Sequence, residues 1–525
     1  MNLNLSELIM NSRVLINSFV VDDLSVSLVH DPVIQNDDNY FSVLTGKNGV
    51  GKSRALEIMS FCIFFIELYP VHEEQFQKQF KYSKHILRTS IPFSSLSFSY
   101  YVGGILNDLT IHDDGSVSSS ITVADKELHP KLICVSNSLF NRFIEGFGQS
   151  HSFPFHDPDK YKNLSLSKDV LKFGGFSDDS FINKVLGHEV IKLLFTDKVN
   201  YIRSMAFMRS FGVTENVTLV LTVNHYLAGA NLDGIKDLEK FKESLKKIVP
   251  HDEEGNATVI TDEMIHTTER MLKYFCGLLD EETRSHFRDD EDGMFFVMGS
   301  PFVTFSFDEN TILEEGLIKD MLFLSEMRIV NVEHLTFKKG DHLVESDKMS
   351  SGELCIFLML LRINSEIEDN TIIMIDEPEI SLHPAWQKKI IPELQRCFIN
   401  YKGCHFIIAT HSPQVVSSLP RDNSSVAILG SDQGAIPGSI VRGKSSDYQL
   451  FATLNYPGEH NEYVIRMLTT IIAKQNIRKE LSGNEIQFLD RAIKMFELNK
   501  DVFSERSENN TIEHLLKQAI GMFSM

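Results

Sequence analysis

The stretch LTGKNGVGKS, Leu44 to Ser53, has residue types and spacing that could hold a phosphate group. Its Gly46, Gly51, Lys52 and Ser53 fit G-x-x-x-x-G-K-[ST], in which glycines let backbone N–H groups approach phosphate oxygens in front of a helix. Lys52 would reach the β- and γ-phosphates of a nucleotide, and Ser53 would bind Mg²⁺. The alternative is a glycine-rich turn without a ligand. The predicted cradle comprises Gly46, Lys47, Asn48, Gly49, Val50, Gly51, Lys52 and Ser53.

A pair of adjacent carboxylates ends a second apolar run, IIMIDEPE, Ile372 to Glu379. At the carboxyl edge of a parallel sheet, Asp376 is placed to hold Mg²⁺ opposite Ser53, through water or directly. Glu377 is positioned to orient or deprotonate the water molecule that attacks a γ-phosphate. The alternative is a strand-ending acidic turn stiffened by Pro378.

Two further segments carry polar residues with more than one interpretation. MSSGE, Met349 to Glu353, contains S-x-x-E, which is a capping box for the helix that follows. The same helix N-terminus offers N–H groups and the Ser350 hydroxyl to a phosphate, and the two roles do not exclude each other. In IIATHSP, His411 follows a buried strand, where it either donates to the γ-phosphate or is a satisfied structural residue.

Apolar runs and helical periodicity predict the elements that would position these residues. Short continuous apolar strands alternate with helices, which favours a parallel sheet covered on both faces and hence an α/β fold. The predicted strands are Arg13 to Val20, Leu24 to Val29, Tyr40 to Leu44, Lys131 to Val135, Phe302 to Phe307, Arg328 to Phe337, Thr371 to Ile375, His405 to Ala409 and Ser425 to Gly430, with hairpins in 94–123. The predicted helices are Arg54 to Leu68, Lys236 to Val249, Asp262 to Leu279, Glu353 to Ile367, Pro384 to Phe398, Glu459 to Lys474, Gly483 to Asn499 and Thr511 to Phe523.

Composition narrows the functional classes. The 525 residues carry a formal charge of −21, which argues against broad non-specific DNA binding through phosphate neutralisation. The six cysteines are scattered without C-x-x-C pairing, as is typical of a reduced cytoplasmic protein. The N-terminus lacks a secretory pattern, and the longest apolar stretch, Ile58 to Leu68, is too short to span a bilayer. We therefore expect a cytoplasmic protein without a membrane segment.

The four motifs, in this order, resemble the ABC-type ATPase heads of the chromosome-maintenance (SMC), RecF-like repair and overcoming-lysogenisation-defect (OLD) ATPases. Gly46 to Ser53 corresponds to Walker A, Met349 to Glu353 to the signature, Ile372 to Glu377 to Walker B and His411 to the switch histidine. The resemblance implies a P-loop ATPase head that binds ATP and Mg²⁺. It implies four parts: 1–137, the Walker A half of the head; 138–300, a mostly helical inserted lobe; 301–444, the second half of the head; and 445–525, a helical partner-docking region.

In such heads, ATP bound to the Walker motifs of one subunit is closed by the signature of another. The resemblance therefore implies a homo-oligomer in which Ser350, Ser351, Gly352 and Glu353 act on the γ-phosphate in trans. One departure is Ser351, which stands where many signatures have glycine, as also happens in the defence branch. The glutamine loop has no clear counterpart, and Asn137 is the nearest in chemistry.

A looser likeness connects the chain with PtuA, the ATPase family of Septu and retron-associated anti-phage systems. The segments behind it are KLICVSNSLFNRF, YKNLSLS, the SSGE and DEPE-x-x-LHP motifs and the helical tail after LNYPGEHNEY. We find no Toprim, HNH or PD-(D/E)xK constellation in the sequence, so any nuclease must be a partner. The likeness implies an HNH endonuclease partner and, in a retron setting, a reverse transcriptase with RNA-linked DNA.

Three functions remain open at the level of sequence. The first is an ATPase regulator in a nuclease-based defence complex, with the helices after about 445 docking the effector. The second is a RecF-like repair ATPase that clamps duplex DNA when its heads close. The third is a nucleotide-binding scaffold with negligible turnover, in which Glu377 would have no catalytic role.

Overall fold

A computed structural model gives the structure of the protein. It describes residues 13–21, 24–30, 38–47, 49–68, 95–102, 104–112, 116–120, 130–137, 143, 160–165, 181–196, 198–223, 230–231, 234–235, 237–249, 259–278, 287–289, 295–297, 302–431, 434–456, 458, 460–477, 479–498 and 511–523. The chain divides into two compact units. The first comprises Met1–Asn163, Glu368–Gln395 and Ile399–Met525, and the second Leu164–Ile367 and Arg396–Phe398.

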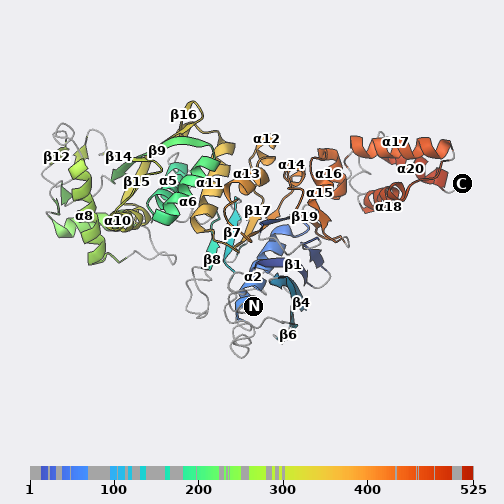
Figure 1. Ribbon diagram of the computed structural model, residues 1–525, viewed down its shortest axis with the longest axis horizontal. Coiled ribbons are helices and arrows are strands. Elements are labelled where there is room, and N and C mark those ends of the chain that lie inside the picture. The colour runs from blue at the N-terminus through green and yellow to red at the C-terminus, as the bar shows by residue number, and fades with distance from the viewer. Residues whose placement is uncertain are drawn as a thin grey trace, which may run out of the picture. The chain divides into compact units, whose positions relative to one another are not determined.

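A mostly parallel sheet forms the centre of the first unit (Figure 1). Within the described residues its strand order is β20-β19-β3-β18-β17-β7-β8, and only β20 pairs in the antiparallel sense. The α/β prediction is confirmed. The strands are β3 (Tyr40–Thr45), β7 (Leu132–Ser136), β8 (Tyr161–Asn163), β17 (Ile372–Asp376), β18 (His405–Ala409), β19 (Ser424–Ile428) and β20 (Ile436–Pro437).

The central strands are continuous apolar runs because both faces of the sheet are covered. Every residue of β3, β17 and β18 is buried. Helix α2 (Lys52–Leu68) contacts β17 and β18, and its Leu56 and Met59 are fully buried. The glycine loop therefore joins a buried strand to a buried helix, as the sequence predicted.

An antiparallel sheet of order β2-β1-β4-β5-β6 adds to the same core. Its strands are β1 (Val14–Val21), β2 (Leu24–Ser27), β4 (Ser95–Val102), β5 (Ile105–His112) and β6 (Val117–Ser119). The predicted hairpins are confirmed, since β4 pairs with β5 from Ser95↔His112 to Val102↔Ile105. The inward residues alternate along β5, where Leu109 and Ile111 are buried.

The C-terminal part of the first unit is helical, as predicted. Helices α17 (Glu462–Asn476), α18 (Gly483–Leu498) and α20 (Thr511–Phe523) share an apolar core that includes Leu468 and Phe488 (Figure 1). Shorter helices precede them at α14 (Pro413–Ser417), α15 (Gly438–Val441) and α16 (Ser446–Ala452). None of the described helices combines the length and apolarity needed to cross a bilayer.

The predicted helix from Pro384 to Phe398 is wrong in its continuity. The structure has two helices instead, α12 (Pro384–Gln387) and α13 (Ile390–Cys397). Pro392 explains the break, because it lacks the N–H that would bond to the carbonyl four residues earlier. At the junction the Lys389 N–H bonds to the carbonyl of Trp386, three residues earlier.

The second unit contains an antiparallel sheet of order β14-β9-β15-β16. Sequence reasoning did not identify β9 (Val213–Val223), which lies between β14 (Phe302–Phe307) and β15 (Val330–Lys339). Its sequence, VTENVTLVLTV, is rich in β-branched residues, and burial alternates from Val217 to Leu221, which is a strand pattern. Val217, Leu219 and Leu221 face the core.

Helices complete the second unit, and α11 carries the signature motif at its start. They are α5 (Phe181–Leu194), α6 (Lys198–Ser210), α7 (Leu238–Ile248), α8 (Asp262–Leu278), α10 (Glu315–Glu326) and α11 (Ser351–Glu366). Small elements join them at β10 (Ala230–Asn231), β11 (Gly234–Ile235), β12 (Phe287–Asp289), β13 (Phe295–Val297), β16 (His342–Glu345) and η1 (Ser346–Lys348). The predicted helices near 236–249, 262–279 and 353–367 are confirmed.

Candidate functional site

Three adjacent strands bring the predicted site residues together. β18 lies between β3 and β17 in the parallel sheet. The glycine loop follows β3, Glu377 follows β17, and His411 lies two residues after β18. Because the carboxyl ends of parallel strands meet at one edge, these residues from distant parts of the sequence converge there, where α/β proteins bind ligands.

The glycines of the loop have the backbone conformations that a phosphate cradle requires. Gly49 and Gly51 have φ angles of +77° and +99°, in the region that favours glycine. At Gly46 a Cβ atom would lie 2.9 Å from Val50 Cγ1, so a larger residue does not fit. Among the eight predicted loop residues, Asn48 lies outside the described residues.

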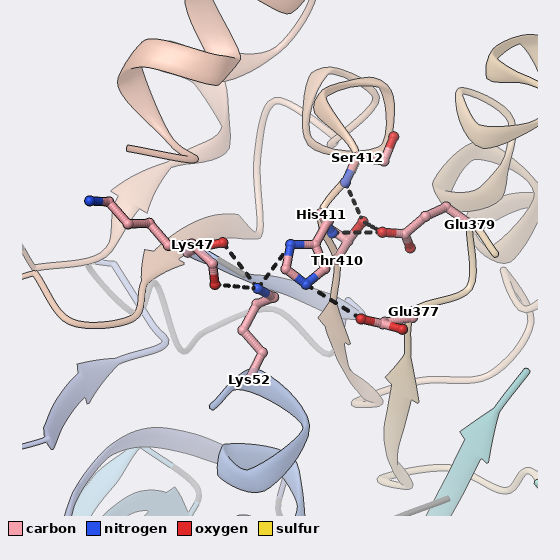
Figure 2. A network of polar contacts seen from close by, with 8 residues as sticks. Lys47, Lys52, Glu377, Glu379, Thr410, His411 and Ser412 are labelled. Carbon is pink, nitrogen blue, oxygen red and sulfur yellow. Dashed lines mark hydrogen bonds and ion pairs between the residues drawn. The ribbon is translucent and has the colours of Figure 1, made fainter. Parts of the chain in front are cut away.

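Lys52 lies at the start of α2 and is only 4% exposed. Its Nζ donates to the carbonyl oxygens of Gly46 at 3.0 Å and Lys47 at 3.1 Å, and contacts His411 Nδ1 at 3.1 Å (Figure 2). Burial lowers the pKa of Lys52 to about 8, although the nearby carboxylates oppose this shift. The lysine is thus a desolvated charge at the loop, suited to bind a phosphate.

Ser53 and Asp376 are in contact, as the sequence predicted for a magnesium site. A hydrogen bond from Ser53 favours the charged form of Asp376, but burial raises the pKa of Asp376 to about 6. The Oδ1 atom of Asp376 is buried and has no hydrogen-bond partner within the part of the chain that the structure describes. A divalent cation is the kind of group that would satisfy this carboxylate oxygen beside a serine hydroxyl. The residues therefore fit Mg²⁺.

Glu377 and His411 form the next part of the network (Figure 2). Glu377 has a φ of +48°, a left-handed conformation that is uncommon outside glycine and occurs at functional sites. Its Oε1 lies 3.4 Å from His411 Nε2. Burial and the charge of Lys52 lower the pKa of His411 to about 4, so the imidazole is neutral. Nδ1 then accepts from Lys52, and Nε2–H faces Glu377.

Glu379 is a member of the site to which sequence reasoning gave no role. Its Oε1 accepts from the backbone N–H of His411 and from Thr410 Oγ1, both at 2.6 Å. Burial raises the pKa of Glu379, and these hydrogen bonds oppose that rise. The signal in the sequence was a third carboxylate in DEPE, two residues after Glu377.

Asn137, the nearest match for the glutamine loop, lies just after β7. Its Nδ2 donates to the carbonyl of Pro378 at 3.5 Å. This contact places the amide beside the turn that carries Glu377 and Glu379. Asn137 therefore borders the site, while its part in nucleotide binding stays a prediction.

The signature residues belong to the second unit, described by itself. Ser350 caps α11, since its Oγ accepts from the Glu353 N–H at 3.3 Å. The Glu353 carboxylate accepts from Lys339 of β15 at 2.5 Å. Ser350 and Ser351 are exposed, whereas Gly352 is buried. The serine half of the predicted capping box is confirmed, whereas the Glu353 carboxylate pairs with Lys339. Phosphate binding by this helix N-terminus stays a prediction.

Comparisons with known proteins agree with a nucleotide site. The family model described as "AAA domain, putative AbiEii toxin, Type IV TA system" matches residues 226–417. The chain is 38% identical over 95 residues to the "Retron Ec83 probable ATPase" of Escherichia coli, covering 18% of this chain and 17% of that protein. It is 22% identical over 403 residues to the "Retron Vc95 probable ATPase" of Vibrio cholerae serotype O1 biovar El Tor, covering 73% and 68%.

A solved structure that aligns with the chain is the Smc head bound to the C-winged helix domain of ScpA. It aligns with 80% of this chain and 98% of that chain, at 11% identity and a TM-score of 0.30.

The described part of the chain shows no cluster of three or more His, Cys, Asp or Glu side chains that could hold a metal by themselves.

Proposed function

We propose that this protein is an ATP-binding and ATP-hydrolysing regulatory subunit of a prokaryotic anti-phage defence complex. The observation that carries the ATPase part is the contact series Lys52–His411–Glu377, which lies beside Ser53 and Asp376 at the sheet edge. In this proposal they serve as a phosphate-binding lysine, a polar switch residue, a base and two oxygen ligands, gathered at the carboxyl ends of three neighbouring strands.

In the proposed reaction, Lys52 binds the β- and γ-phosphates, and the loop N–H groups orient them. Glu377 accepts a proton from the attacking water molecule while the water oxygen bonds to the γ-phosphorus. The bond between the γ-phosphorus and the β–γ bridging oxygen breaks at the same time. ADP and phosphate leave. Mg²⁺, held by Ser53 and Asp376 when bound, would supply positive charge to the phosphate oxygens.

His411 has a defined part in this proposal. Its neutral ring accepts from Lys52 through Nδ1 and presents Nε2–H toward Glu377, 3.4 Å away. A γ-phosphate oxygen offers that N–H an alternative acceptor. The contact between His411 and Glu377 would thereby depend on whether the γ-phosphate is present.

We propose that the site is completed by a second copy of the chain. The exposed Ser350 and Ser351, at the N-terminus of α11, would bind the γ-phosphate held by the first copy. The macrodipole of a 16-residue helix favours an anion at this end. ATP would then join two heads, and hydrolysis would release them.

The defence role is supported by the names of the two relatives described above, each of which is called a retron probable ATPase. The aligned parts span 17% and 68% of those proteins, so the role of the whole chain is a proposal. We propose an HNH endonuclease as partner, docked on the C-terminal helices, and a reverse transcriptase with its RNA-linked DNA as further members. The charge of −21 disfavours a chain that grips DNA broadly on its own.

The Glu377→Gln variant tests the ATPase proposal. It should bind ATP like the wild type but hydrolyse it slower by several powers of ten, because it removes a positioned base. It should also accumulate as an ATP-dependent oligomer, visible by light scattering with ATP and absent with ADP. Wild-type turnover in this variant would contradict the role of Glu377.

Co-purification from cells that express the neighbouring genes tests the defence proposal. The expected outcome is a complex that contains a nuclease and whose composition or nuclease activity changes in the Glu377→Gln variant. Tight, steeply salt-dependent binding of duplex DNA by the chain alone, with no nuclease bound, would instead support a repair clamp.

A further inference from the structure

The backbone of the histidine segment, Thr410 to Ser412, is fixed where the sheet ladder ends. The last strand-type bond joins the Thr410 N–H to the Leu44 carbonyl at 3.1 Å. One residue later, the His411 N–H bonds to a side chain, the Oε1 of Glu379, at 2.6 Å. The direction of the His411 peptide therefore depends on Glu379.

Glu379 holds this segment at two points through one oxygen atom. Its Oε1 also accepts from Thr410 Oγ1 at 2.6 Å, and Thr410 Oγ1 accepts in turn from the Ser412 N–H at 2.9 Å. Figure 2 shows these contacts on the side of His411 opposite Lys52. Because a carboxylate is a stronger acceptor than a neutral oxygen, these are strong restraints.

The turn that carries Glu377 also carries Glu379. Glu377 donates its N–H to the Ala409 carbonyl, and the Ile380 and Leu382 N–H groups bond to the carbonyls of Glu377 and Glu379. Glu377 and Glu379 are thus parts of one hydrogen-bonded turn. Movement of that turn would move Glu377 and the backbone of His411 together.

The second oxygen of Glu379 lies in a different environment from the first. Oε2 is buried and has no hydrogen-bond partner among the described residues. A buried carboxylate oxygen without a donor costs free energy, and residues that carry such a cost are typical of functional sites. Glu379 is therefore a poor choice for a purely structural cap.

We infer that Glu379 is a positioning residue for hydrolysis, an inference that rests on the proposed ATPase function. It fixes the peptide of His411 so that the imidazole stays between Lys52 and Glu377. It does not touch the phosphates in this scheme. Its loss should lower the rate of the chemical step and leave ATP binding intact.

The test compares Glu379→Ala with Glu379→Gln in the whole 525-residue chain. The glutamine keeps a carbonyl oxygen for both donors, so kcat should stay within about threefold of wild type. The alanine removes the acceptor, and kcat should fall on the order of tenfold to a hundredfold, since small displacements cost that much. For both variants, KM and the affinity for a fluorescent ATP analogue should change by less than about threefold.

A spectroscopic readout separates positioning from general loss of structure. In protein labelled with ¹⁵N-histidine, the His411 signals, assigned by comparison with His411→Gln, should show the neutral Nε2–H form in the wild type and in Glu379→Gln. In Glu379→Ala they should broaden or shift. An unchanged His411 signal and kcat in Glu379→Ala would overturn the inference, and so would an equal loss of kcat in both variants.

Two further variants keep the outcome interpretable. Thr410→Val removes one of the two donors and should lower kcat severalfold. If Glu379→Ala does not fold, an unchanged kcat in Thr410→Val overturns the inference. Glu377→Gln measured alongside addresses the proposed function itself: normal turnover there means that the ATPase assignment has failed, whatever Glu379 does.

Discussion

At the scale of single residues, the groups around Lys52 determine the partners and the pKa of its ammonium group. Its ammonium group has two carbonyl oxygens and a neutral imidazole as partners, and burial lowers its pKa to about 8. The proximity of this charge helps to keep the pKa of His411 at about 4, because two adjacent cations repel each other. To bind a phosphate, Lys52 would exchange at least one of these partners for a phosphate oxygen.

Lys52→Ala should therefore abolish nucleotide binding, since Lys52 is the one charged side chain that the proposal places on the β- and γ-phosphates. Isothermal calorimetry with a non-hydrolysable ATP analogue measures the effect, with at least a hundredfold loss of affinity expected, about 2.7 kcal/mol or more. The control is Lys402→Ala, which removes the same charge at an exposed position after α13. Equal affinity in the two variants would contradict the assignment of the glycine loop.

At the scale of elements, β18 begins with one histidine, His405, and a second, His411, follows two residues after its end. His405, its first residue, is fully buried. Its side chain contacts β1 and β3 and, through Ser42, the residue that follows β2. Its Nδ1 accepts from the Ile16 N–H at 3.2 Å, and its Nε2 contacts Ser42 Oγ at 2.8 Å. Ser42 in turn donates to the Leu28 carbonyl. These contacts require a neutral ring, and burial lowers the pKa of His405 to about 3.

His405 should make stability depend on pH. The unfolded chain binds a proton here below about pH 6.5, whereas the folded protein resists protonation down to about pH 3. Between these values the unfolded state binds more protons, so this stabilisation is complete above about pH 6.5 and is lost as the pH falls. The melting temperature should thus drop less between pH 7.5 and pH 5 in His405→Gln than in wild type. Parallel curves would refute this contribution.

The start of α11 offers a second test at the same scale, because capping and phosphate binding by Ser350 can be separated. Asparagine is as good an N-cap as serine, whereas alanine costs about 1 kcal/mol. Ser350→Asn should melt like the wild type and Ser350→Ala should melt earlier, by differential scanning fluorimetry. Both should lose ATP-dependent oligomerisation in the Glu377→Gln background, because both lack the hydroxyl. Oligomers that persist in both would restrict Ser350 to its capping role.

In the first unit as a whole, the C-terminal helices are attached close to the strand that leads into the glycine loop. Thr45 Oγ1, at the end of β3, contacts the Thr453 carbonyl at 2.7 Å. Arg491 of α18 donates to the neighbouring Ala452 carbonyl at 2.7 Å and to Asn455 Oδ1 at 2.9 Å. The guanidinium also lies over the ring of Phe451, 5.7 Å from its centroid. Arg491 thus joins α18 to the segment that Thr45 contacts.

Arg491→Ala should loosen the attachment of the C-terminal helices by about 2 kcal/mol, because two half-buried oxygens, the Ala452 carbonyl and the Asn455 amide oxygen, lose a charged donor. Hydrogen exchange followed by mass spectrometry should show faster exchange in α17 and α18 and little change in β17. The matched control is Arg466→Ala, at an exposed position on α17. Similar exchange in both variants would mean that Arg491 does not hold these helices.

The sequence by itself determined the motifs, the apolar strands and most helices, because these depend on the spacing of neighbouring residues. It also predicted that Lys52, Ser53, Asp376, Glu377 and His411 share a site, and these residues lie together in the structure. Local patterns missed the break that Pro392 makes between α12 and α13, and they missed β9 within a region that reads as mostly helical.

Only the tertiary structure decided which side chains touch. The order β3-β18-β17 places His411 between Lys52 and Glu377, although 359 positions separate Lys52 from His411 in the sequence. Likewise, the acceptor for the His411 N–H is Glu379, 32 positions earlier. Strand order and side-chain partners follow from packing between distant segments, so no local spacing encodes them. That is why Glu377, the proposed base, was recognised in the sequence, whereas the contact of Glu379 with the His411 backbone was not.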